Sequence, residues 1–199
     1  HQEEALKLFL SKDINDVSEL TQKLNEYNKT RQEIEKRIFE DATIQIEKQG
    51  IANKNTIVLM GENWHHGVIG IVASKITEMY FKPSILLCEE GEIGKGSGRS
   101  VPGFDLYETL TQCSNTIGRF GGHAMAVGIT INKEQFGAFR KQFEQLAKEK
   151  YIEDIVPILK IDSQISLDEI DKNMVESLRE LEPFGEENKT PLFLFRNLK

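Results

Sequence analysis

The stretch NTIVLMGENWHHGVIGIVASKITEMYFKPSILLC, residues 55–88, decides the fold class. Its first six residues form a β-branched, apolar run bounded by polar residues, which predicts a strand. The segment 67–80 has helical spacing, with Gly67, Gly70 and Ala73 as a face of small residues. The run 84–88 follows a proline and predicts a buried strand. A strand, a helix and a strand in succession predict an α/β fold, in which helices pack on a sheet.

The residues before this stretch, 1–50, are expected to be helical, with one break near SKDIND, residues 11–16. Apolar residues recur there at spacings of three and four, which is the pattern of one helix face. The stripe consists of Val17, Leu20, Leu24, Tyr27, Arg31, Ile34 and Ile38. A self-standing coiled coil is the alternative, but Arg31 interrupts the stripe and the run is short for that class. We therefore expect a long connecting helix that lies along a domain.

The residues after the stretch continue the α/β pattern to about residue 150. IGKGSGRS, residues 93–100, is a glycine-rich strand or loop, and HAMAVGITI, residues 123–131, is the next strand. A capping box at Asp105 and Glu108 opens one helix. Residues 155–162 and 192–198 are expected to be strands, on either side of a helix that begins at a capping box of Ser166 and Glu169. The chain thus divides into 1–50, 51–150 and 151–199.

Composition and charge limit the function classes. The 199 residues are 39% hydrophobic and 29% charged, and the net charge of −7 argues against an indiscriminate nucleic-acid binder. A narrow, locally positive groove remains compatible with that charge. No apolar run reaches the length of a membrane span, no signal peptide is present, and Cys88 and Cys113 match no metal or disulfide spacing. We expect a cytoplasmic protein without a membrane partner and, since the chain does not begin with methionine, a fragment of a longer one.

Glycine and histidine are concentrated in three loops, and the first is GENWHHGVIG, residues 61–70. It joins a strand end to a helix N-terminus, where free N–H groups and the helix dipole attract anions. His65 and His66 can add hydrogen-bond donors, and Trp64 offers a face on which a base can stack. The alternative is structural: Trp64 fills the core and one histidine caps the helix.

The second loop is GKGSGRSVPG, residues 94–103. Serine hydroxyls, backbone N–H groups and a guanidinium are the groups that proteins use to hold phosphate. Ser97, Arg99 and Ser100 are therefore candidate phosphate ligands, although a flexible hairpin is the alternative. The spacing does not fit a Walker A motif, so a P-loop nucleoside triphosphatase is not supported.

The third loop is GRFGGHAMAVGI, residues 118–129. Gly121 and Gly122 expose backbone N–H groups beside His123, which can donate to a phosphoryl oxygen. The alternative is a tight turn that enters a strand. No partner residues at metal-ligand spacing accompany His123, and the carboxylates of the middle region do not suggest a two-metal centre. We therefore predict no metal site in this chain, which resembles half of an active site.

Together the three loops resemble a known family. WHHGVIGIVASKITEMYFKPSILL, GKGSGRSVPGFDLYETL and RFGGHAMAVGITI are similar to the DHH-associated domain of the RecJ family of single-strand-specific exonucleases, within the DHH phosphoesterase superfamily. LTQKLNEYNKTRQEIE, residues 20–35, is similar to the helix that precedes this domain in the family. LRELEPFGEENKTPLF, residues 178–193, resembles the junction into an oligonucleotide-binding β-barrel. The resemblance implies a mixed sheet flanked by helices, then the start of that barrel in 151–199.

The resemblance also implies a function. The family degrades single-stranded DNA from the 5′ end with two Mn²⁺ or Mg²⁺ ions held by a DHH domain, whose aspartate motifs this chain lacks. The chain would be the substrate-binding half, inactive and metal-free alone, a monomer whose partners are single-stranded DNA and the DHH domain. Arg99, Ser97 and Ser100 would clamp phosphate, and His123 on Gly121 and Gly122 would contact the scissile or terminal phosphate. His65 and His66 would line the same cleft.

Two other functions remain open at this point. One is a fragment of an oligoribonucleotide or cyclic-dinucleotide phosphodiesterase of the same superfamily, which would not need a barrel after Pro191. The other is a non-enzymatic module that binds nucleic acid or protein.

Overall fold

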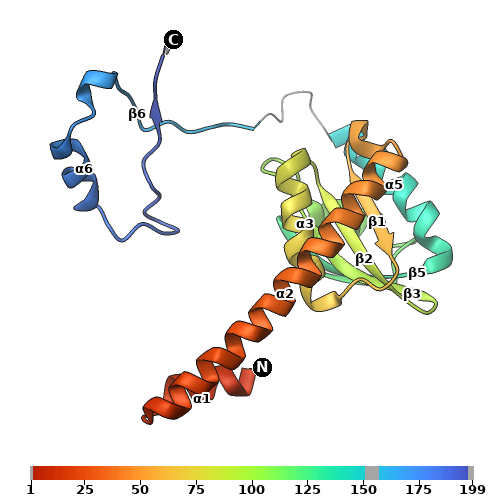
Figure 1. The fold of residues 1–199 in the computed structure, drawn as a ribbon. Helices are drawn as coiled ribbons and strands as arrows, with labels where there is room; N and C mark the ends of the chain where they lie inside the picture. The colour runs from red at the N-terminus through yellow and green to blue at the C-terminus, as the bar shows by residue number, and fades with distance from the viewer. Residues whose placement is uncertain (1, 151–156, 197–199) are drawn as a thin grey trace. The chain divides into compact units, whose positions relative to one another are not determined.

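The computed structural model describes residues 2–150 and 157–196, which belong to two compact units, residues 1–155 and 156–199. The first unit begins with two helices and a five-stranded mixed sheet follows (Figure 1). Its elements are α1 (Gln2–Leu10), α2 (Ile14–Lys48), η1 (Ile51–Asn53), β1 (Ile57–Gly61), α3 (His66–Tyr80), β2 (Ser84–Glu90), β3 (Ile93–Arg99), α4 (Leu106–Gln112), β4 (Arg119–His123), β5 (Ala126–Asn132), η2 (Lys133–Gln135) and α5 (Phe136–Lys150).

The long helix predicted in residues 1–50 is α2, with 35 residues. It begins at Asp13, whose side chain accepts a hydrogen bond from the Asn15 backbone N–H at 2.7 Å and so replaces one missing helical partner. This cap explains the break in the segment 11–16. Ile38, Ala42 and Ile46, in the C-terminal half of α2, are fully buried against the sheet, whereas the N-terminal half projects past it with α1 alongside (Figure 1).

The sheet has the strand order β1-β2-β3-β5-β4. β1 and β2 are parallel, because α3 carries the chain back across the sheet between them, and every other neighbouring pair is antiparallel. The predicted α/β class, with a mixed sheet flanked by helices, is therefore confirmed. The strand–helix–strand prediction for residues 55–88 corresponds to β1, α3 and β2.

Each face of the sheet carries its own core. On one face α2 and α3 pack on Ile57, Leu59 and Leu86. On the other face α4 and α5 pack on Ile85, Leu87 and Ile131, with Phe139 and Phe143 of α5 fully buried there. Because successive side chains of a strand point to opposite faces, adjacent residues of β2 serve different cores.

Two strand predictions need correction. The single strand expected at 123–131 is β5 at Ala126–Asn132, and Arg119–His123 forms a further strand, β4, where a loop or tight turn was expected. Ala124 and Met125 form the turn between β4 and β5. The strand expected at 155–162 is absent from its described part, 157–162, where the apolar side chains are exposed and find no neighbouring strand. Residues 155 and 156 lie outside the described residues.

The second unit is small and open. It contains β6 (Ser163–Gln164), η3 (Leu167–Glu169), α6 (Lys172–Arg179) and β7 (Phe193–Leu194), and β6 pairs in parallel with β7. The capping box of Ser166 and Glu169 is present, but it caps the short turn η3, while Asp171 caps α6. None of the described residues 157–196 is buried. Across both described ranges, no helix is long and apolar enough to cross a membrane.

Candidate functional site

Alternation along β3 separates two kinds of residue. Lys95, Ser97 and Arg99 point to the face that carries α3, while the glycines between them point to the opposite core. A Cβ atom at Gly98 would lie 2.8 Å from Val127 Cγ2, and one at Gly94 would lie 2.6 Å from Met60 Cε. The end of the Met60 side chain could move away from a Cβ at Gly94, whereas a Cβ at Gly96 would lie 1.8 Å from the Leu86 carbonyl oxygen. Glycine at 96 and 98 therefore lets a polar strand lie in the middle of a packed sheet.

The register of β3, β5 and β4 places nine residues on one side of the sheet. Residues that pair directly across antiparallel strands share a face, so each row of three has a common orientation. The rows are Arg99–Ala126–His123, Ser97–Gly128–Gly121 and Lys95–Thr130–Arg119. We call this surface the open face, because its middle row consists of Ser97, Gly128 and Gly121 and its outer strand, β4, is largely exposed.

A cavity of about 500 Å³ lies where the open face meets α3. Its wall on one side is the first turn of α3, with His66, Gly67 and Gly70, and on the other side the polar residues of β3 and the backbone of β5. A Cβ at Gly70 would lie 3.0 Å from Arg99 Nη2, so glycine gives the guanidinium its space. The positive end of the α3 dipole faces this cavity, which favours an anionic ligand.

Arg99 is the half-buried cation of the cavity. Its Nη1 donates to Ser97 Oγ and to the Gly98 carbonyl oxygen, each at 2.8 Å. Burial lowers the pKa of the Arg99 guanidinium from its ordinary value, but an arginine remains charged in a protein. Within the described ranges no carboxylate pairs with it. A partly desolvated charge without a counterion is costly, and a bound anion would offset that cost.

The three candidate ligand-binding residues of the loop 61–70 have different roles in the structure. Trp64 is only 8% exposed, packs in the core beneath α2 and α3, and donates from Nε1 to Asp41 Oδ2 at 2.7 Å. The prediction that a base stacks on Trp64 is therefore wrong, because the indole ring lies in the core. His65 caps α3, accepting the Gly67 N–H at Nδ1 over 3.1 Å, and only His66 lines the cavity.

The two serines beside Arg99 also differ. Ser97 lines the cavity, accepts from Arg99 and donates weakly to the Val127 carbonyl oxygen at 3.3 Å. Ser100 is 7% exposed and donates to the Phe104 carbonyl oxygen at 2.7 Å, which holds the turn into α4. The prediction that Ser100 binds phosphate directly is therefore wrong, because its hydroxyl is buried within that turn.

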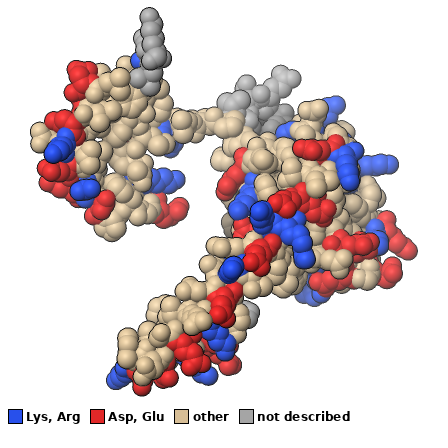
Figure 2. Space-filling model, in the orientation of Figure 1, with Lys and Arg blue, Asp and Glu red and all other residues tan. Residues whose placement is uncertain are grey.

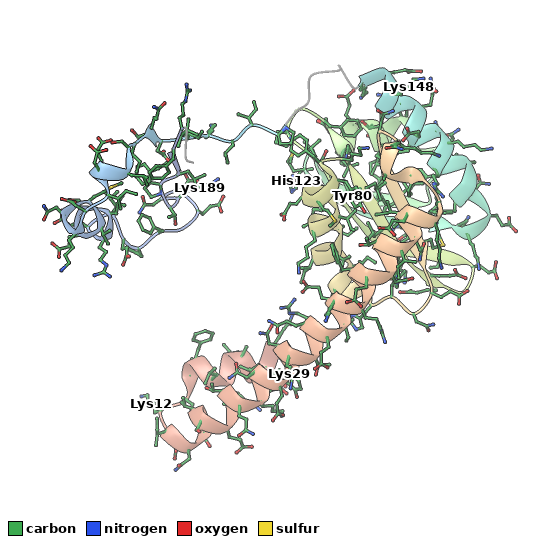
Figure 3. All side chains as sticks on the ribbon, turned by 45° about the horizontal axis from the view of Figure 1, so that its top comes forward. Lys12, Lys29, Tyr80, His123, Lys148 and Lys189 are labelled. Carbon is green, nitrogen blue, oxygen red and sulfur yellow. The ribbon has the colours of Figure 1, made fainter. Side chains whose placement is uncertain are left out.

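The Gly-Gly-His element lies at the end of the edge strand β4. Gly122 has φ +144°, and a Cβ there would lie 2.2 Å from the Ala126 carbonyl oxygen, whereas a Cβ at Gly121 would meet nothing within 4 Å. His123 is exposed and accepts the Met125 N–H at Nδ1 over 3.3 Å, which leaves the Nε2–H as the donor toward a ligand (Figure 3).

Arg99 and His123 thus share a face but not a cavity. They occupy one row of the open face, two strands apart, which corresponds to about 10 Å between Cα atoms. His123 does not line the cavity at Arg99. A ligand that touches both must extend across β5.

The sequence analysis did not identify two cationic residues of the open face, Lys95 and Arg119. Lys95 follows from the alternation Lys-x-Ser-x-Arg along β3, and Arg119 from Arg-x-Gly-x-His along β4. The period of two was hidden by Gly96 and Gly98 in β3 and by the adjacent Gly121 and Gly122 in β4.

Charge on the rest of the first unit is mixed. Figure 2 shows Lys and Arg interspersed with Asp and Glu over the face turned to the viewer, without a broad basic surface. Within the described residues no three His, Cys, Asp or Glu side chains are grouped closely enough to hold a metal ion. The residues that the structure describes therefore offer no set of three such ligands for a divalent metal ion.

Comparison with protein families gives two matches. The DHHA1 domain matches residues 53–149, and the RecJ OB domain matches residues 161–199. The division into three parts at residues 50 and 150 stays a prediction, although these matches lie inside its second and third parts.

Curated relatives match almost the whole chain. The single-stranded-DNA-specific exonuclease RecJ of Bacillus subtilis is 34% identical over 196 residues, covering 97% of this chain and 25% of that protein. RecJ of Haemophilus influenzae is 30% identical, covering 94% of this chain and 34% of that protein. The chain therefore spans only a quarter to a third of the length of these relatives.

Solved structures of RecJ also match this chain. RecJ from Thermus thermophilus in complex with Mg²⁺ superposes with a TM-score of 0.83 at 29% identity, over 96% of this chain and 29% of that one. An exonuclease RecJ bound to manganese has a TM-score of 0.64 at 32% identity, over 73% of this chain and 36% of that one.

Proposed function

The chain contains the DHHA1 domain and the RecJ OB domain of the RecJ exonuclease family, and on this premise we propose that it is the substrate-holding part of a 5′-to-3′ single-stranded-DNA exonuclease. The observation that carries the proposal is Arg99, a half-buried guanidinium without a carboxylate partner in the described residues, facing a cavity beside the α3 N-terminus. In this role Arg99 binds a phosphodiester oxygen, and Ser97 orients the guanidinium.

The remaining site residues act around that contact. His66 lines the cavity from the first turn of α3, and His123 donates from Nε2 to a phosphate farther along the same row. Gly121 leaves the floor open and Gly122 shapes the turn that presents His123. An in-line attack requires a phosphodiester held in one pose, and these residues supply that positioning.

The hydrolytic step belongs to a different domain. Two Mn²⁺ or Mg²⁺ ions, held by a DHH domain outside this chain, would activate the attacking water, which agrees with the Mg²⁺ and Mn²⁺ reported for the RecJ structures. The partners of the chain are single-stranded DNA and that DHH domain, and its compartment is the cytoplasm. The RecJ OB match at 161–199 favours this function over a small-nucleotide phosphodiesterase, which would not need a barrel.

Binding of a fluorescent 5′-phosphorylated oligothymidylate to the 199-residue chain, followed by anisotropy at low salt, tests the proposal. Arg99→Lys keeps the charge but loses the planar fork of donors, and we expect about a tenfold loss of affinity, close to ~1.4 kcal/mol. Lys148→Ala removes an exposed charge from α5 on the opposite face and serves as the matched control (Figure 3).

The same chain incubated with Mn²⁺ and the oligonucleotide should produce no degradation. Metal-dependent degradation by the purified chain that disappears with Arg99→Ala would contradict the assignment to a non-catalytic half. Equal affinity of wild type and Arg99→Lys would remove the phosphate contact on which the proposal depends.

A further inference from the structure

The row of the open face farthest from Arg99 consists of Lys95, Thr130 and Arg119. Lys95 and Arg99 are four residues apart on β3, so the two rows are separated by about 13 Å along the strands. Arg119 stands at the same distance from His123 on β4. The open face therefore carries cationic or donor side chains at both ends.

Arg119 is the uncompensated charge of this far row. The Lys95 ammonium lies 3.0 Å from Glu90 Oε2, so its charge is partly neutralised. Arg119 is exposed, and within residues 2–150 and 157–196 it makes no ion pair. The Thr130 hydroxyl belongs to the half-buried residue between them. A guanidinium presents several donors in one plane, which matches the oxygens of a phosphodiester.

The middle row separates the two ends without obstructing them. It consists of Ser97, Gly128 and Gly121, and a Cβ at Gly128 would come no closer than 4.0 Å to another atom. The cavity of about 500 Å³ reaches Lys95 and Thr130 as well as Arg99. Arg119 and Gly121 do not line this cavity, so a strand that reaches Arg119 continues past the cavity onto the exposed edge strand β4.

We propose that Arg119 binds a second phosphodiester of the same single strand, at least one nucleotide away from the phosphate at Arg99. This inference rests on the proposed function and adds a subsite to it. The open face then holds a strand by two phosphates, with Gly128 and Gly121 beneath the sugar-phosphate chain. Two fixed points define the direction in which a strand lies on the sheet, which one contact cannot do.

The test compares a ligand with one phosphate and a ligand with several. Thymidine 5′-monophosphate and a 5′-phosphorylated hexathymidylate are titrated into the 199-residue chain at low salt, with affinities taken from amide chemical-shift changes. For Arg119→Ala we expect hexamer binding to weaken about five- to tenfold and monophosphate binding to stay within about twofold. The salt dependence of hexamer binding should fall by about 0.7 in log K per log salt, one single-strand phosphate contact.

Three further variants separate the possible explanations. Arg119→Lys should restore part of the hexamer affinity, Arg99→Lys should weaken both ligands, and Lys148→Ala should change neither. Because Arg119 is exposed, its replacement should leave the thermal midpoint within about 2 °C, so a loss of hexamer binding cannot be attributed to unfolding.

The outcomes distinguish this inference from the proposed function. If Arg119→Ala leaves hexamer binding unchanged, or weakens both ligands equally, while Arg99→Lys weakens both, the second subsite is wrong and the proposed function stands. If neither arginine variant affects either ligand, or the wild-type chain binds neither, both the subsite and the proposed function are wrong.

Discussion

At the scale of single residues, the open face depends on glycines that serve different physical purposes. Gly96 and Gly98 are required by the packing around β3, because a Cβ would lie 1.8 Å from the Leu86 carbonyl oxygen at Gly96 and 2.8 Å from Val127 Cγ2 at Gly98. Gly122 is required by its backbone, since its φ is +144° and a Cβ there would lie 2.2 Å from the Ala126 carbonyl oxygen. Gly121 is required by neither, since its Cβ would point into open space. Gly121, like Gly128 in the same row, is therefore free to reflect the demands of a ligand.

Adjacent substitutions at 121 and 122 should separate stability from binding. Gly122→Ala should cost about 1–3 kcal/mol of unfolding free energy from backbone strain alone, and lower the thermal midpoint by several degrees. Gly121→Leu should leave the midpoint within about 2 °C, yet reduce oligothymidylate affinity about tenfold by raising the floor of the open face. Thermal denaturation and anisotropy measure the two effects. Unchanged oligonucleotide affinity in a folded Gly121→Leu variant would place the strand elsewhere.

At the scale of elements, the helix–sheet contacts show what local pattern can and cannot predict. The segment 55–88 was predictable, because strand and helix periods are clear there and each element finds its partner nearby in sequence. β4 was missed, since Gly121 and Gly122 conceal the alternation of Arg119 and His123. The role of Trp64 depends on Asp41, which lies 23 residues earlier in the chain, and no local pattern reveals such a contact.

A second long-range contact, between α2 and α3, could not be predicted from local sequence pattern either. Glu35 on α2 is 7% exposed and accepts hydrogen bonds from Lys75 of α3 and, at 2.5 Å, from Arg31 Nη1. Arg31, which interrupts the apolar stripe of the long helix, therefore neutralises the buried carboxylate of Glu35. The Lys75 hydrogen bond, followed by that of Arg31, holds the pKa of Glu35 below its ordinary value.

Glu35→Gln should lower the free energy of unfolding by about 1–2 kcal/mol at pH 7, a moderate value because both cations are partly exposed. A carboxylate with a depressed folded pKa stabilises the fold above its unfolded pKa, near 4.5, and that contribution is lost as pH falls through the folded pKa. The stability difference between wild type and Glu35→Gln should therefore shrink below pH 4.5. Urea denaturation at several pH values measures it, with the exposed Glu33→Gln as control. A difference independent of pH would mean that the ion pairs do not stabilise the α2–α3 contact.

At the scale of the whole molecule, the two units differ in how their elements are held. In the first, helices pack on both faces of a five-stranded sheet, and aromatic side chains of α5 are fully buried. In the second, the paired strands have two residues each and no described side chain is buried. The sequence indicated the start of a barrel by resemblance. In the described residues the apolar run 157–162 has no partner strand, and the run that begins at Leu192 pairs only through Phe193 and Leu194. Secondary structure that buries so little surface gains little against chain entropy.

Hydrogen exchange on the intact chain should therefore divide along this boundary. Amides of β6, β7 and α6 are expected to exchange nearly as fast as an unstructured chain, with opening free energies below about 1–2 kcal/mol. Amides of β2, β3 and β5 should exchange only through unfolding of the first unit, because they lie in the centre of its sheet.

Within the sheet, the edge strand β4 supplies an internal comparison, since it pairs on one side only and should open more readily than β5. Mass spectrometry of peptic fragments resolves these regions. Protection across 163–194 equal to that of β2 would show that the second unit is stabilised by contacts beyond those of its own short elements.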